Sequence, residues 1–220
     1  MDSAIPEFGR AGWIHKVGAV GAVLVPAALL FSFFTAGDTG DTPAELVAYA
    51  RDNSTEVWWL QILALAAPLL LGLFFAGLWM RLRAASEAYR AMTLIGGTLF
   101  IAFFSTGFTL WAAPLIDDEG VTEAGAEAYL MYDDAGWVLL GLSGISLGVA
   151  IIGVSLAAIE HAWLPKWAGW VSLALGIVSL ATIVAVGIFA WAAWLIAAGI
   201  LLLLRGDRVL PPAPAPRPVA

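Results

Sequence analysis

Two histidines and a glutamate are the residues whose types best suit metal chemistry. His15 precedes the first long apolar run of the chain, and Glu160 and His161 follow the fourth. Two imidazoles and a carboxylate form a ligand set that zinc or iron accepts, provided that the first and fourth runs are neighbours. The alternative is that each is an ordinary residue whose polar end lies among lipid headgroups. The metal hypothesis therefore depends on whether those two runs meet.

A second group of polar side chains lies inside the apolar runs and could hold a small molecule through hydrogen bonds. Its members all fall in the half of the predicted membrane that borders two acidic loops; they are Gln61, Ser105, Thr109, Ser143, Ser146 and Thr182. Helix bundles often bind ligands between their helices. The group therefore predicts an outward-facing pocket, with Gln61 as its strongest hydrogen-bonding side chain. The alternative is that serine and threonine bond the carbonyls of their own helix and help helices to pack.

Ionisable side chains are absent from the interior of every apolar run. Proton pumps, voltage sensors and ion-coupled transporters carry such groups at depth, because one must bind the ion or move charge. Retinal needs a buried lysine, and bis-histidine haem needs histidines within the spans. These classes are excluded, and no cofactor is expected. The chain also has no cysteine, which excludes disulfides and thiolate metal sites.

The elements that position these residues are transmembrane helices. Of 220 residues, 61% are hydrophobic and 12% are charged, about half the charged share of a soluble domain. A helix needs about 20 apolar residues to cross a bilayer. The resulting six predicted spans cover about 17–36, 58–80, 91–116, 136–159, 167–185 and 188–204. The last two form one uncharged stretch that is too long for a single crossing, so it is expected to fold back at Gly187.

The segments outside the spans are short. Thr42 followed by Pro43 and Glu45 predicts the start of a short helix in the first outer loop, ending near Asp52. A second short helix is expected within the next outer loop, over about 122–132. The acids of that loop lack the spacing of a calcium loop and are expected to be solvated. Residues 1–16 form a predicted cytoplasmic N-terminus, and the proline-rich tail 205–220 is expected to be disordered.

Charge and tryptophan positions predict the orientation. Nine of the ten basic residues fall on one side of a six-span chain, and Arg51 is the exception. Basic residues in short loops stay in the cytoplasm, so both termini are predicted to be cytoplasmic in a multi-pass protein of the cell membrane. Tryptophan prefers the membrane interfaces, and Trp191 and Trp194 are expected near the outer one. The net charge of −7 argues against nucleic acid as a partner.

Small residues form stripes on the fourth and fifth spans. Gly144 and Gly148 share one face of the fourth span, and Gly169 and Gly176 share a face of the fifth. Small residues let helix backbones approach closely in a membrane. The stripes predict either packing of these two spans within the chain or a seam between two copies of it.

The turn between the fourth and fifth spans carries a family resemblance. It reads Leu164-Pro165-Lys166-Trp167-Ala168-Gly169-Trp170, an LPxWxGW pattern. This turn, together with the long outer loops, resembles uncharacterised actinobacterial six-span membrane proteins that are grouped as a domain of unknown function. The resemblance implies a fold and a membrane location, and no catalytic residues.

The sequence thus predicts an all-α, six-helix transmembrane bundle with short extracellular helices in its first two outer loops. The leading hypothesis for function is a non-enzymatic protein that binds a lipid-like or small amphipathic molecule, or a partner subunit, through the outer half of the bundle. A passive or facilitated transporter and a membrane-embedded enzyme are the alternatives. Besides the lipid bilayer, the partners considered are a lipid-like ligand, a second copy of the chain and another membrane subunit.

Overall fold

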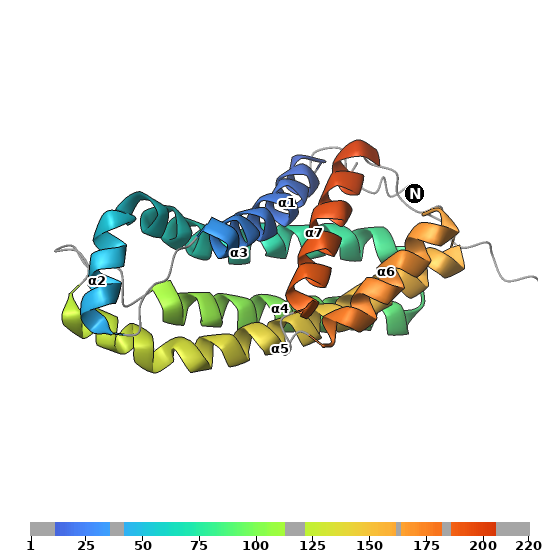
Figure 1. Cartoon of the computed structure of the whole chain (residues 1–220). Coiled ribbons are helices and arrows are strands. Elements are labelled where there is room, and N and C mark those ends of the chain that lie inside the picture. The colour runs from blue at the N-terminus through green and yellow to red at the C-terminus, as the bar shows by residue number, and fades with distance from the viewer. Residues whose placement is uncertain (1–11, 36–41, 113–121, 162–163, 182–185, 206–220) are drawn as a thin grey trace, which may run out of the picture.

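The protein is helical throughout the part that the structure describes, as the all-α prediction requires. The computed structural model describes residues 12–35, 42–112, 122–161, 164–181 and 186–205, which contain no strand (Figure 1). In chain order the elements are α1 (Gly12–Thr35), α2 (Pro43–Asp52), α3 (Ser54–Arg81), the 3-10 turn η2 (Leu82–Ala84), α4 (Glu87–Ala112), α5 (Glu123–His161), α6 (Lys166–Ser179) and α7 (Val186–Arg205). The proline-rich tail after Arg205 lies outside the described residues.

Four helices, α3, α4, α5 and α7, are long and apolar enough to cross a membrane. The other two predicted spans correspond to α1, whose described apolar part is the shorter segment His15–Phe31, and to α6, which has 14 residues. A helix of that length rises about 21 Å, less than the roughly 30 Å of hydrocarbon in a bilayer. The described residues therefore contain four full-length candidates among the six predicted spans.

The short helix in the first loop is confirmed. α2 begins after Thr42, whose hydroxyl accepts a hydrogen bond from the Glu45 backbone N–H at 3.3 Å, while the Glu45 carboxylate accepts one from the Thr42 N–H at 3.1 Å. This reciprocal pair satisfies two backbone donors at the helix start. Leu46 and Ala50 are buried, and α2 packs on the first turns of α5.

The residues of the short helix expected over about 122–132 are helical from Glu123 onward, but the prediction that this helix is separate from the following span was wrong. α5 is one continuous helix of 39 residues, about 58 Å long, so the expected short helix and the expected span 136–159 are parts of the same rod. Its start is fixed by Thr122, whose hydroxyl accepts a hydrogen bond from the Gly125 N–H at 3.1 Å. The adjacent acids Asp133 and Asp134 marked a membrane boundary in the sequence, but charge does not break a helix.

The predicted hinge at Gly187 is also wrong. α6 ends at Ser179, and the N–H groups of Leu180 and Ala181 bond the carbonyls of Ile177 and Val178, three residues back. Such bonds tighten the last turn of a helix. Gly187 lies in the first turn of α7. The fold-back therefore begins several residues earlier than the glycine suggested.

The six helices other than α2 form a closed ring (Figure 1). Following the ring, α1 packs on α3, α3 on α4, α4 on α5, α5 on α6, α6 on α7, and α7 returns to α1. The α4–α5 interface is the most extensive. Leaving α2 aside, each of these six helices packs on the next one along the chain, and α7 packs on α1.

The glycine stripes pack α5 on α6 within the chain, as one of the two predicted readings requires. A Cβ added at Gly148 would lie 2.9 Å from the Gly176 carbonyl oxygen, and one at Gly169 would lie 2.7 Å from the Ile159 side chain. Distances this short leave no room for a larger residue. α6 is therefore held tightly against α5 along its length.

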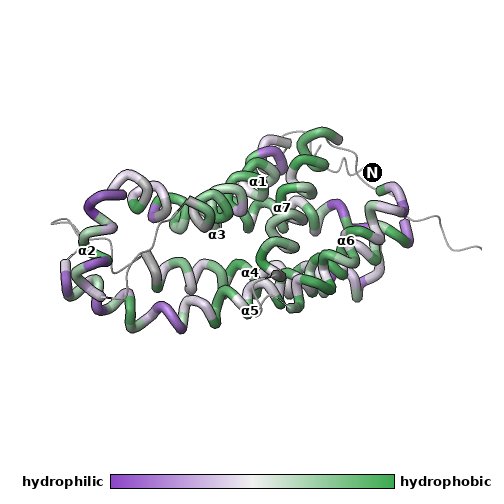
Figure 2. Tube along the Cα trace, in the orientation of Figure 1, coloured by the Kyte–Doolittle hydropathy of each residue, from purple (hydrophilic) through white to green (hydrophobic). Residues whose placement is uncertain are grey.

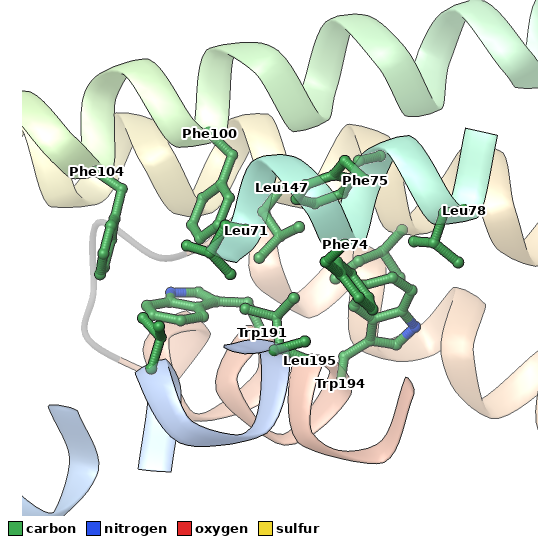
Figure 3. Packing of buried hydrophobic residues seen from close by; sticks show 14 of the residues in the cluster. Leu71, Phe74, Phe75, Leu78, Phe100, Phe104, Leu147, Trp191, Trp194 and Leu195 are labelled. Carbon is green, nitrogen blue, oxygen red and sulfur yellow. The ribbon is translucent and has the colours of Figure 1, made fainter. Parts of the chain in front are cut away.

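An aromatic core fills the ring (Figure 3). Trp191 of α7 is 0% exposed and meets Phe100 and Phe104 of α4 at ring-centroid distances of 5.6 and 6.1 Å. Trp194 is likewise buried and lies 6.2 Å from Phe74. Both tryptophans therefore face the interior of the bundle, and their expected depth near the outer interface stays a prediction.

Polar residues gather at two opposite ends of the bundle (Figure 2). The acidic end comprises α2 and the first turns of α5, with acids that include Glu45, Glu123, Glu127, Asp133 and Asp134. The basic end comprises the α3–α4 turn and the α5–α6 turn, with Arg81, Arg83, Arg90 and Lys166. The ring between the two ends is largely apolar.

Candidate functional site

Two of the hydroxyls of the predicted outer pocket donate hydrogen bonds to carbonyls of their own helix. Ser143 donates to the Leu140 carbonyl at 2.7 Å, and Ser146 donates to the Leu142 carbonyl at 2.8 Å, all within α5. A serine in a membrane helix satisfies its hydroxyl in this way without any ligand. Both side chains are buried. Their geometry matches the packing alternative.

The other members of that group that the structure describes lie on α3 and α4. Gln61 is half-buried on α3, Thr109 is exposed on α4, and Thr182 lies outside the described residues. Ser105 of α4 has a buried hydroxyl with no hydrogen-bond partner among the described residues. The structure thus places Ser143 and Ser146 on one helix and does not gather the group around the cavity described below.

The three candidate metal ligands do not come together. His15 lies against α3, where a Cβ added at Gly77 would be 2.9 Å from its Nδ1 atom, and α1 packs mainly on α3 and α7. Glu160 and His161 end α5. Within the described ranges, no three histidine, aspartate or glutamate side chains are grouped closely enough to hold a metal.

A partly open cavity of about 160 Å³ lies toward the basic end, between α5, α6 and α7, and Leu78 near the end of α3 forms part of its wall. Its walls are nearly all hydrocarbon and comprise Leu78, Val154, Leu164, Trp167, Ala168, Val171, Ser172, Leu175, Trp194, Ala197, Ala198, Leu201 and Leu202. Figure 3 shows Leu78 and Trp194 near each other at the edge of the aromatic core, and both residues belong to the cavity wall. A dry apolar cavity of about 150 Å³ is large enough to bind benzene.

The cavity exists because α6 and α7 diverge. Figure 1 shows the two helices close together near the turn that joins them and apart toward their other ends. α6 cannot follow α7, because Gly169 and Gly176 hold it against α5. The small side chains of Ala168, Ala197 and Ala198 leave the resulting space unfilled.

One hydrogen bond joins two of the residues in the cavity wall. The indole N–H of Trp194 donates to the Ser172 hydroxyl and joins α7 to α6. None of the lining side chains is titratable. The site can therefore bind an apolar group, and its own walls offer no acid, base or metal ligand for a reaction.

Two basic residues lie close in the chain to residues of the cavity wall, although neither is itself part of the wall. Arg81 is 9% exposed and lies one helical turn beyond Leu78 of the cavity wall. Lys166 is exposed and directly precedes Trp167, another wall residue. Both positions belong to the basic end.

The acidic end carries a small cluster of titratable groups, in the part of α5 that precedes the predicted span 136–159. Burial raises the pKa of the Tyr129 phenol, and the nearby Asp133 and Tyr49 raise it further. Burial also raises the pKa of the Asp133 carboxyl, with a second contribution from Asp134. Like charges and lost hydration both disfavour the ionised forms. The cluster lies away from the cavity, at the opposite end of the bundle.

Sequence reasoning missed the cavity because leucine, valine and alanine in its walls look the same as lipid-facing residues. A pattern that could have indicated the cavity is the presence of alanines on the sixth span together with glycines on the fifth span, because the glycines hold the fifth span close to the fourth. Comparison with known proteins adds no second view of the site, since no protein-family model, curated protein or solved structure matches the chain.

Proposed function

We propose that this protein is a non-enzymatic integral membrane protein that binds a hydrocarbon chain of a lipid-like molecule in the cavity at its basic end. The cavity itself carries the proposal: its walls are apolar, its volume suits a segment of chain, and it lies in a bundle with four membrane-length helices. A binding role fits better than a reaction, because no wall residue is titratable. The proposed ligand site is therefore in the opposite half of the bundle from the outer pocket that the sequence predicted.

The proposal includes the six-span topology in the cell membrane. α1 has 24 residues, about 36 Å of helix, which is enough for a crossing. The proposed fifth span, 167–185, extends beyond α6. The excess of lysine and arginine at the basic end supports a cytoplasmic location for that end and for both termini. Membership of the six-span family that the LPxWxGW turn resembles is part of the same proposal.

The experiment that tests the binding role fills the cavity. Ala198→Phe places a ring in the cavity, whereas Ala193→Phe places the same ring on the exposed face of α7. Native mass spectrometry after mild extraction should find lipid on the wild type and on Ala193→Phe, and little on Ala198→Phe. Equal lipid on all three proteins would rule the cavity out as the binding site.

A further inference from the structure

The cavity at the basic end has an open side and a closed end. Along the α6 wall the exposure falls from one helical turn to the next: Trp167 is 70% exposed, Val171 is 52% exposed and Leu175 is half-buried. Facing that wall, Trp194 of α7 is only 3% exposed. The cavity therefore opens beside Trp167 and closes beside Leu175 and Trp194.

The closed end lies where α6 and α7 come together. Among the described residues of these two helices, Leu175 and Trp194 are the wall residues nearest to the turn that joins them. Figure 1 shows the helices converging toward that turn. Trp167 to Leu175 and Trp194 to Leu202 each cover eight residue steps, which is about 12 Å of helix. The cavity is thus a wedge that narrows toward Trp194.

The bundle beyond the closed end is filled with side chains. Trp191 lies one helical turn before Trp194 and is 0% exposed, and its ring is 5.6 Å from that of Phe100 on α4. On α6, Ser179 lies one turn beyond Leu175 and is also buried. A hydrocarbon chain that enters the wedge therefore meets packed side chains at this level.

Trp194 is held in its position from two directions. Its indole N–H donates a hydrogen bond to the Ser172 hydroxyl of α6. Its ring lies edge-on to Phe74 of α3, with the ring centroids 6.2 Å apart (Figure 3). Moving the indole aside would leave the N–H of a buried side chain without a partner, which is costly. The indole therefore forms a fixed end wall.

We infer that Trp194 and Leu175 limit the length of hydrocarbon chain that the cavity holds, so that the site selects lipids by chain length. This inference rests on the proposed lipid-binding function and names the specificity of the same site. A chain shorter than the wedge leaves wall atoms without contacts and loses dispersion energy. A longer chain gains no contact beyond Trp194. Three bonds of an extended chain span about 3.6 Å, so about 12 Å of wall matches a chain of roughly ten carbons.

The test compares lipids that differ only in chain length. The full-length protein is incubated in detergent micelles that contain equal amounts of octanoyl, decanoyl, myristoyl and stearoyl lysophosphatidylcholine, and native mass spectrometry gives the amount of each that is bound. Binding to the wild type should rise on the order of tenfold from the octanoyl to the decanoyl lipid and then level off, because the added methylenes fill the wedge.

Two leucines of the wall provide a matched pair of variants. Leu175 and Leu202 are both half-buried against the core, but Leu175 lies at the closed end and Leu202 at the wide end. Leu175→Ala should let the myristoyl lipid bind better than the decanoyl lipid by on the order of threefold, because it lengthens the wedge. Leu202→Ala should leave the chain-length profile of the wild type unchanged.

The outcomes separate this inference from the proposed function. A wild type that binds none of these lipids would overturn both. An unchanged profile in Leu175→Ala, or the same shift in both leucine variants, would overturn the length limit and leave the cavity as a lipid site. Trp194→Leu removes the indole itself and should also shift the profile toward long chains. If either Leu175→Ala or Trp194→Leu fails to elute as a single folded species, the other variant decides.

Discussion

The described residues toward the two ends of the bundle show different features. Toward the acidic end, the hydroxyls of Ser143 and Ser146 bond their own helix, and α2 covers the start of α5. Toward the basic end, α6 and α7 separate and leave a cavity with apolar walls. The contrast shows that polar side chains in a membrane helix do not by themselves make a pocket, because carbonyls of the same helix compete for them. Space arises where helices diverge.

The largest expected effect concerns which half faces the cytoplasm. A reporter enzyme that is active only outside the cytoplasm should be silent when fused after Arg208 and active when inserted next to Glu123, because the basic end is retained inside. The measurement is reporter activity in intact cells at equal expression. Activity at the C-terminal fusion would reverse or change the proposed topology, and with it the leaflet that supplies the lipid.

Gly148→Leu tests the close contact that keeps α6 on α5 and away from α7. A leucine there meets the Gly176 carbonyl and the Leu180 side chain, so the variant should lose about 1–3 kcal/mol of unfolding free energy, as overpacked cores do. Gly72→Leu is the matched control, because a Cβ at Gly72 has no atom within 4 Å. Thermal unfolding in detergent gives both values. Equal losses in the two variants would contradict the packing described here, and a change in oligomer size alone would point to a seam between copies.

Ser143→Ala and Ser146→Ala test the outer pocket that the sequence predicted. Each hydroxyl bonds a carbonyl of its own helix, and that carbonyl retains its backbone partner, so each variant should change stability by less than about 0.5 kcal/mol and leave bound lipid unchanged. Thermal unfolding and native mass spectrometry provide the two readouts. Loss of a bound molecule in either variant would revive the outer pocket that the sequence predicted.

The smallest effect is expected at Asp133. Because its folded pKa is raised, the stability associated with its protonated form is present below the unfolded pKa and is lost as pH rises through the folded value. Asp133→Asn should therefore be slightly more thermostable than the wild type at about pH 7, and the difference should vanish near pH 3. Glu127→Gln changes an exposed acid on the same helix and serves as the control. If the wild type instead became more stable than Asp133→Asn as pH rises, the pKa of Asp133 would be lowered by folding, which contradicts the prediction.

Local chemistry explains what could be predicted from the sequence. The capping pair of Thr42 and Glu45 acts over three residues, so the start of α2 follows from the sequence alone. The apolar runs of α3, α4 and α7 are likewise local, and the structure contains each of them. The glycines at 148 and 176 suggested close helix contacts, although only the structure shows that both belong to the same interface.

Properties that depend on two or more helices could not be predicted. The burial of Trp191 among the phenylalanines of α4 depends on how α7 is rotated against that helix, which the sequence does not specify. The cavity depends on the angle between α6 and α7, which no spacing along the chain encodes. Arg81 looked like one of several topological arginines until its burial was known.

Because α5 is one unbroken helix, its backbone does not mark where the bilayer begins. The side chains along it determine how deeply the protein sits in the membrane. Within a continuous helix the backbone groups bond one another, so the 39 residues of α5 can lie in water or lipid without losing those bonds. The acids Asp133 and Asp134 resist entry into hydrocarbon on one side only. A thinner membrane exposes apolar residues of α5 to water at a hydrophobic cost but without breaking backbone hydrogen bonds, while a thicker one pulls the two acids into hydrocarbon, which costs more per residue. The protein should accordingly tolerate thin bilayers better than thick ones.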